Sequence, residues 1–212
     1  MIQDHSKILV LGCNTCVSVC HAGGNKEAEI LASLLRILAT QNHVPVEIMH
    51  TAIKRQCEDH QDFYEISKEL QWTDCILSTA CGVGVQFLAE RFPEMPVYPG
   101  IDSCFLGATE EVGLWTERCQ ACGQCILALT GGICPITRCA KRLLNGPCGG
   151  SSQGKCEINP ELDCAWQLII ERLKHLGRLE EFYEQLPPLK DWSHERAGGP
   201  RSVTKEESPS KT

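Results

Sequence analysis

The second half of the chain carries a dense run of cysteines whose spacing is typical of metal-binding proteins. The first three lie two residues apart, in a C-x2-C-x2-C pattern, so their thiolates can converge on one centre. A Cys-Pro pair then follows, as in bacterial ferredoxins. Eight soft ligands are enough for two four-coordinate sites, which predicts iron–sulfur or zinc chemistry. The run consists of Cys119, Cys122, Cys125, Cys134, Cys139, Cys148, Cys156 and Cys164.

The start of this run predicts a [4Fe–4S] cluster held by Cys119, Cys122 and Cys125. Cys134 is a candidate fourth ligand, but the Cys-Pro ligand of two-cluster ferredoxins binds the other cluster, so it could belong to either site. A four-cysteine zinc site is the alternative.

The end of the run predicts a further metal site. Its cysteines are separated by seven and eight residues, whereas zinc knuckles usually use paired C-x2-C ligands. This favours iron–sulfur, with zinc as the alternative, and the spacing leaves the division of ligands between the two sites open. The candidate ligands besides Cys134 are Cys139, Cys148, Cys156 and Cys164.

The N-terminal half offers a separate group of thiols. A C-x2-C-x3-C pattern follows an apolar run, and two more cysteines follow later apolar runs. Five candidates for four places predict another [4Fe–4S] cluster; the alternative is that Cys13 and Cys81 are small buried residues in glycine-flanked turns. The candidates are Cys13, Cys16, Cys20, Cys57 and Cys81. The remaining Cys75 and Cys104 are expected to be packing residues.

The elements that must position this N-terminal group alternate between strands and helices. Such alternation with short connections predicts a parallel α/β sheet. Loops that leave the carboxyl ends of parallel strands meet at one edge, so the five N-terminal cysteines should lie together there. Strands are expected over 7–12, 44–49, 75–79 and 97–100, and helices over 26–40, 62–70 and 85–91.

The fold class predicted for the whole chain is therefore α/β: a small parallel-sheet domain over 1–112 and a cysteine-rich, metal-stabilised domain of loops and short helices over 113–186. The second domain has little apolar sequence before an amphipathic helix over 165–176, so metal must contribute to its stability. A short helix is expected over 179–185. The segment 187–212 has the composition of a disordered tail.

Composition narrows the functional class. The net charge of -7 argues against nucleic acid as a partner. The first residues lack the basic and apolar regions of a signal peptide, and no segment is apolar enough to span a membrane. A cytoplasmic location is therefore expected, where clustered cysteines among the 15 of this chain indicate metal sites rather than a disulfide scaffold. No dinucleotide fingerprint, P-loop or catalytic triad is present, so we expect no flavin on this chain and no complete active site.

The cysteine-rich segment also resembles a known family. Gly132-Ile-Cys-Pro-Ile-Thr-Arg-Cys, Asn145-Gly-Pro-Cys-Gly-Gly and Asp163-Cys-Ala-Trp are similar to the methylenetetrahydrofolate reductase C-terminal domain family. The N-terminal Gly-Cys-x-x-Cys with His-Ala-Gly-Gly, Arg55-Gln-Cys and Ala80-Cys-Gly-Val-Gly-Val-Gln look like the rest of a MetV-type small subunit.

This resemblance implies an electron-transfer role. Members accompany MetF, the flavin-containing subunit that reduces 5,10-methylene-tetrahydrofolate to 5-methyl-tetrahydrofolate in the one-carbon metabolism of the Wood–Ljungdahl pathway. The resemblance implies two or three [4Fe–4S] clusters, with zinc as an alternative at one site, and an upstream electron donor. The cluster cysteines of the family correspond to the candidates named above. A zinc-stabilised structural subunit that anchors the flavoprotein is the competing interpretation, and a self-contained flavin enzyme ranks last.

Overall fold

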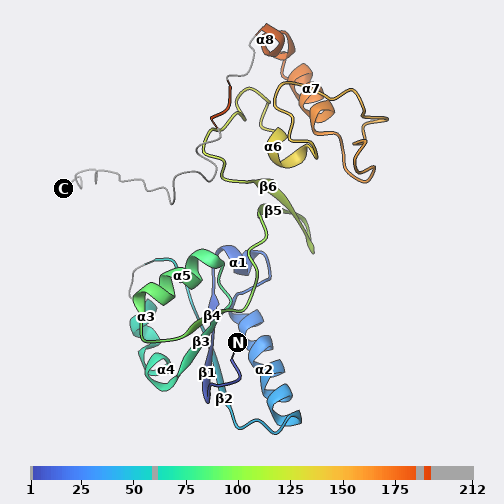
Figure 1. Ribbon diagram of the computed structural model, residues 1–212. Helices are drawn as coiled ribbons and strands as arrows, with labels where there is room; N and C mark the ends of the chain where they lie inside the picture. Colours follow the sequence, from blue (N-terminus) through green and yellow to red (C-terminus); the bar gives the residue numbers. More distant parts are fainter. Residues whose placement is uncertain (1, 59–61, 185–188, 192–212) are drawn as a thin grey trace, which may run out of the picture. The chain divides into compact units, whose positions relative to one another are not determined.

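The computed structural model describes residues 2–58, 62–184 and 189–191 (Figure 1). The chain divides into two compact units, Met1–Cys104 and Phe105–Thr212, which are described separately. The division lies before the predicted boundary between 112 and 113, because a hairpin that straddles that boundary belongs wholly to the second unit. Except for residues 189–191, the predicted tail over 187–212 lies outside the described residues.

The first unit is built on a four-stranded sheet in the order β2-β1-β3-β4. All its pairings are parallel, which confirms the predicted sheet. β1 occupies a central position, and every residue from its second onward is buried, as expected for a strand covered on both faces. The strands are β1 (Lys7–Cys13), β2 (Glu47–Ile53), β3 (Cys75–Ser78) and β4 (Val97–Pro99).

Helices cover both faces of this sheet and make three layers (Figure 1). α2 (Asn25–Gln41) buries Ala28 and Ala32 against one face, together with Ile8 and Val10. The opposite face packs against α3 (Asp62–Glu65), α4 (Ser67–Trp72) and α5 (Gly82–Arg91). Alternate residues of β1 enter the two cores, because successive side chains of a strand point to opposite faces.

Three elements differ from the expected ranges. The second strand is not 44–49 but starts at Glu47 and ends at Ile53, because pairing with β1 continues through the polar His50 and Thr51. The single helix expected over 62–70 is divided at Ile66, which lies between α3 and α4. α5 begins at Gly82 rather than at 85, so a helix starts directly after Cys81.

The second unit contains an antiparallel hairpin and a small helical core. The hairpin of β5 (Leu106–Glu111) and β6 (Leu114–Cys119) was not predicted, and its turn includes Gly113 with φ of 89°. α7 (Ala165–His175) confirms the predicted amphipathic helix and buries Trp166, whose Nε1 donates to the carbonyl of Leu143 at 2.9 Å. The other helices are α6 (Pro135–Arg138) and α8 (Leu179–Glu184).

Across the part of the chain that the structure describes, no helix combines the length and the apolar character needed to cross a membrane.

Candidate metal centres

Four cysteines of the first unit gather at the carboxyl edge of its sheet. Cys13 ends β1 and is buried, and Cys57 follows β2. Cys16 begins the short helix α1 (Cys16–Val19), and Cys81 is the N-cap of α5. Burial raises the pKa of the Cys57 thiol, and the negative charges of Cys13, Cys81 and Cys16 raise it further. These four thiols are therefore close enough to influence one another electrostatically, although they come from four separate segments.

The fifth candidate ligand of the first unit, Cys20, lies at the end of α1. Cys20 is the C-cap of α1 and is exposed, whereas Cys16 lies at the other end of that helix. Like Cys16, it is exposed, and it lies about one helical turn beyond Cys16.

A buried polar network lies behind this group and joins the loops that carry it. The side chain of Gln56 donates from Nε2 to the carbonyl of Leu11 at 2.8 Å and accepts at Oε1 from the hydroxyl of Ser78 at 2.5 Å. Ser78 Oγ in turn accepts from the backbone N–H of Ala80 at 3.2 Å. Gln56 directly precedes Cys57, and Ala80 directly precedes Cys81. The network therefore fixes where these two cysteines lie.

Sequence reasoning missed Gln56 and Ser78 as positioning residues. Both are buried, at 1% and 0% exposure, although both side chains are polar. The available signal was a serine at the carboxyl end of an apolar strand and a glutamine next to a candidate ligand. Buried polar side chains must be hydrogen-bonded, so such residues indicate a specific local arrangement.

The loop after α1 returns to the same edge. The hydroxyl of Thr79 donates to the carbonyl of Gly23 at 2.9 Å, and the N–H of Cys13 donates to the same carbonyl at 2.9 Å. A Cβ atom at Gly23 would overlap the carbonyl oxygen of Thr79. Only glycine permits this close approach, which holds the loop after Cys20 against the ends of β1 and β3.

In the second unit, Cys119 ends β6, and Cys122 and Cys125 lie in the loop that follows. The N–H of Ala121 donates to the sulfur of Cys119 at 3.3 Å. Cys134 is the N-cap of α6, and this helix is tied to β6 because the Thr137 hydroxyl donates to the Arg118 carbonyl at 3.1 Å. The start of α6, with Cys134, therefore lies near the end of β6, where Cys119 is found.

The last four cysteines of the run line one small pocket: Cys139, Cys148, Cys156 and Cys164. The backbone N–H groups of Asn159 and Ile158 lower the pKa of the Cys156 thiol, because they donate hydrogen bonds to its sulfur. The N–H of Gly150 donates to the sulfur of Cys148 at 3.4 Å. Donors aimed at sulfur stabilise thiolates, which are the form that binds metal.

Charged side chains border the same pocket. Cys148 Sγ lies 3.2 Å from Oε1 of Glu157, and this carboxylate also pairs with Lys141. Hydrogen bonds from Lys141 and Cys148 lower the pKa of Glu157. At neutral pH Glu157 is therefore a carboxylate that can orient the Cys148 thiol.

The sulfurs of these groups are more widely spaced than the ligands of one ion. Zn–S bonds of about 2.3 Å place the sulfurs of a tetrahedral site about 3.8 Å apart. Among the described residues, only one set of three ligating side chains has all its donor atoms within 4.8 Å of one another, and it contains a single cysteine.

Comparison with known proteins relates the second half of the chain to one family. Residues 98–193 match the family model described as methylene-tetrahydrofolate reductase C terminal. Comparisons with curated proteins and with solved structures find no match. The matched range includes the eight-cysteine run but not the N-terminal group.

Proposed function

We propose that this chain is the electron-transfer subunit of a methylenetetrahydrofolate reductase, passing electrons to or from the flavin of a MetF-type partner subunit. The observation that carries the proposal is the gathering of Cys13, Cys16, Cys57 and Cys81 at one edge of the sheet. The family match over residues 98–193 connects the chain to this reductase and supports a complex with it.

The ligand sets that we propose follow the three groups of thiols. The first [4Fe–4S] cluster would be held by Cys13, Cys16, Cys57 and Cys81, which leaves Cys20 as the spare. The second would be held by the C-x2-C-x2-C group with Cys134. The third site, iron–sulfur or zinc, would use the four cysteines of the shared pocket. Iron–sulfur clusters supply one-electron storage over a wide range of potentials.

The protein's own contribution is to orient the thiolates and to tune them. The backbone donors on Cys119, Cys148 and Cys156 would stabilise negative charge on sulfur. Such hydrogen bonds raise the reduction potential of a bound cluster. The potential also depends on how far the cluster is buried from solvent. α5 begins directly after Cys81, so this candidate ligand lies at the N-terminus of a helix.

The test is the metal and sulfide content of the full chain purified without oxygen, followed by electron paramagnetic resonance after dithionite reduction. Two clusters give about eight irons per chain with matching sulfide, and a third cluster or one zinc accounts for the last site. Rapid reduction of a MetF-type flavoprotein by the reduced chain would establish the electron-transfer role.

Two results would overturn the proposal. Zinc without iron would leave a structural subunit that only anchors the flavoprotein. A chain that reduces methylene-tetrahydrofolate from an artificial donor, with no flavoprotein present, would be an enzyme in its own right.

A further inference from the structure

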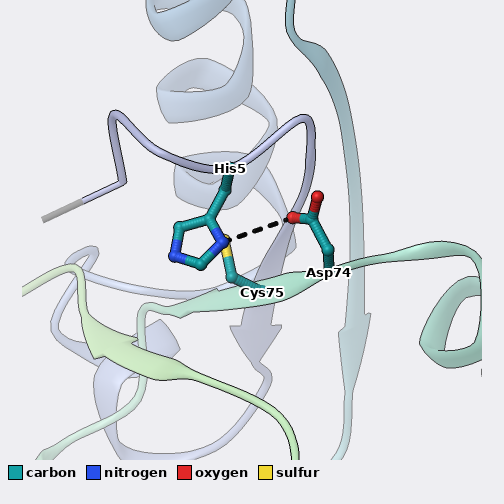
Figure 2. A group of neighbouring side chains, drawn as sticks. All are labelled: His5, Asp74 and Cys75. Atoms are coloured by element: carbon teal, nitrogen blue, oxygen red, sulfur yellow. Dashed lines mark ion pairs between the residues drawn. The ribbon is translucent and has the colours of Figure 1, made fainter.

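The amino edge of the same sheet, opposite the cysteine-bearing loops, holds a second and chemically different group. His5 lies just before β1, and Asp74 and Cys75 lie at the start of β3 (Figure 2). Their donor atoms all lie within 4.8 Å of one another, and His5 Nδ1 is 3.5 Å from Asp74 Oδ1. Bonds of about 2.0–2.1 Å to a tetrahedral zinc place such a nitrogen and oxygen about 3.3 Å apart. The observed separation is therefore close to that of two ligands on one ion.

His5 and Asp74 each use one polar atom of the side chain in hydrogen bonds to other residues. His5 Nε2 is hydrogen-bonded to the hydroxyl of Tyr98 at 3.0 Å. Asp74 Oδ2 accepts from the backbone N–H groups of Ser6 at 2.9 Å and Lys7 at 3.1 Å. Ligating histidines and carboxylates in proteins are oriented in this way, by hydrogen bonds to the atom that does not bind the metal. His5 Nδ1 and Asp74 Oδ1 are left facing each other.

The three side chains of this group differ in how far they are buried. The Cys75 side chain is fully buried, whereas the side chains of His5 and Asp74 are 16% and 44% exposed. Burial, followed by the charge of Asp74, raises the pKa of the Cys75 thiol to about 11. Without a cation, Cys75 is a neutral packing residue; with one, its sulfur lies at the inner side of a site that opens to solvent past Asp74.

We propose that His5, Asp74 and Cys75 form a binding site for a single divalent transition-metal ion such as Zn²⁺. One nitrogen, one oxygen and one sulfur suit zinc, and water would occupy the fourth position. Binding transfers the Cys75 thiol proton to solvent as the sulfur bonds to the ion. The ion would join the segment before β1 to the start of β3. This site is separate from the proposed iron–sulfur ligands and does not depend on them.

The experiment measures zinc per chain in the full-length protein, with its iron–sulfur sites filled without oxygen before equilibration against Zn²⁺ buffered by a chelator. The variants are His5→Ala and Cys75→Ala. The matched controls are His43→Ala and Cys104→Ala, which remove an exposed histidine and an exposed cysteine outside the group. Iron content, measured on the same samples, reports whether each variant keeps its other sites.

We expect the wild type and both controls to hold one more zinc per chain than His5→Ala and Cys75→Ala, with equal iron in all five proteins. Equal zinc in all five would overturn the proposal. Because Cys75 is buried and its variant can fail to fold, His5→Ala decides the question alone in that case.

Tyr98→Phe provides a graded second test, since it removes the hydrogen bond to His5 but no ligand. Loss of such an outer partner weakens metal affinity by about 10–100-fold. The affinity is read from the zinc retained at increasing chelator concentration, and an unchanged affinity would contradict the arrangement described here.

Discussion

At the scale of single residues, Gln56 shows how a side chain that binds no metal can decide whether a site forms. It is buried, and it links β1 to the end of β3 through Leu11 and Ser78. Gln56→Met keeps the volume but removes the acceptor of the buried Ser78 hydroxyl. Leaving such a group unpaired costs about 1–3 kcal/mol. We expect a melting temperature lower by several degrees and a loss of iron from the first unit, measured by calorimetry and by iron content.

Gln86→Met is the matched control for this substitution. Gln86 is exposed on α5, and its amide donates only to the backbone carbonyl of Gly82 at 3.0 Å. If both glutamine variants lower stability and iron content equally, Gln56 has no special positioning role.

Cys75 provides a prediction about thiol reactivity at the same scale. Because burial raises its pKa to about 11, the thiol stays protonated below that pH. The thiolate is the form that reacts with iodoacetamide, and Cys75 is also fully buried, so it can react only when the fold opens. At pH 8 the alkylation of Cys75 in the native protein should therefore be at least about tenfold slower than that of the exposed Cys104, and denaturant should remove the difference. Peptide mapping by mass spectrometry measures both rates. Equal rates at the two cysteines in the native protein would show that the fold does not protect the thiol.

At the scale of elements, the loop over 20–24 depends on the absence of a side chain at Gly23. A methyl group there would meet the carbonyl of Thr79, so Gly23→Ala must displace backbone and costs about 1–3 kcal/mol. We expect lower iron content, because the carbonyl of Gly23 accepts a hydrogen bond from the N–H of Cys13 and the loop follows the helix that begins at Cys16. Gly82→Ala is the control: it adjoins Cys81, but its Cβ would meet only Ser103 Oγ at 3.9 Å. Equal losses in both variants would contradict the close-approach argument.

Elements also show what the sequence could and could not predict. The parallel sheet, α2 and α7 were predictable because their apolar residues recur with the period of a strand or a helix. β2 was misplaced because its middle is polar and its limits are set by pairing with β1. The hairpin of β5 and β6 was missed because none of its strand residues is buried, so little hydrophobic pattern marks it.

For the candidate sites, the sequence could predict which residues are candidate ligands but not how they group in space. Spacing alone marks the cysteines as ligands, since thiols two or three residues apart can reach one centre. It could not show that Cys13, Cys16 and Cys81 all lie near Cys57, which depends on how the loops after separate strands fold. Nor could it show the group of His5, Asp74 and Cys75, because His5 is far in sequence from the adjacent Asp74 and Cys75 and meets them through the pairing of β1 with β3.

At the scale of the whole molecule, the two units have separate hydrophobic cores, so damage to one metal site should stay local. Cys57→Ala should remove about four irons per chain, those of one cluster, while the cysteine run of the second unit keeps its metal. Cys20→Ala should retain all of the iron. Iron, sulfide and zinc analysis measures both variants. Loss of all metal from Cys57→Ala, or loss of four irons from Cys20→Ala, would contradict this assignment.

The length of β1 limits electron transfer between the two edges of the sheet. β1 runs from Lys7, two residues after His5, to Cys13, and its six steps of about 3.3 Å place the two edges of the sheet about 20 Å apart. Electronic coupling decays steeply across such a span. A metal ion at the amino edge would therefore exchange electrons only slowly with the cluster proposed at the carboxyl edge. If both proposed sites are filled, one strand separates a redox-active end of the sheet from a redox-inactive one.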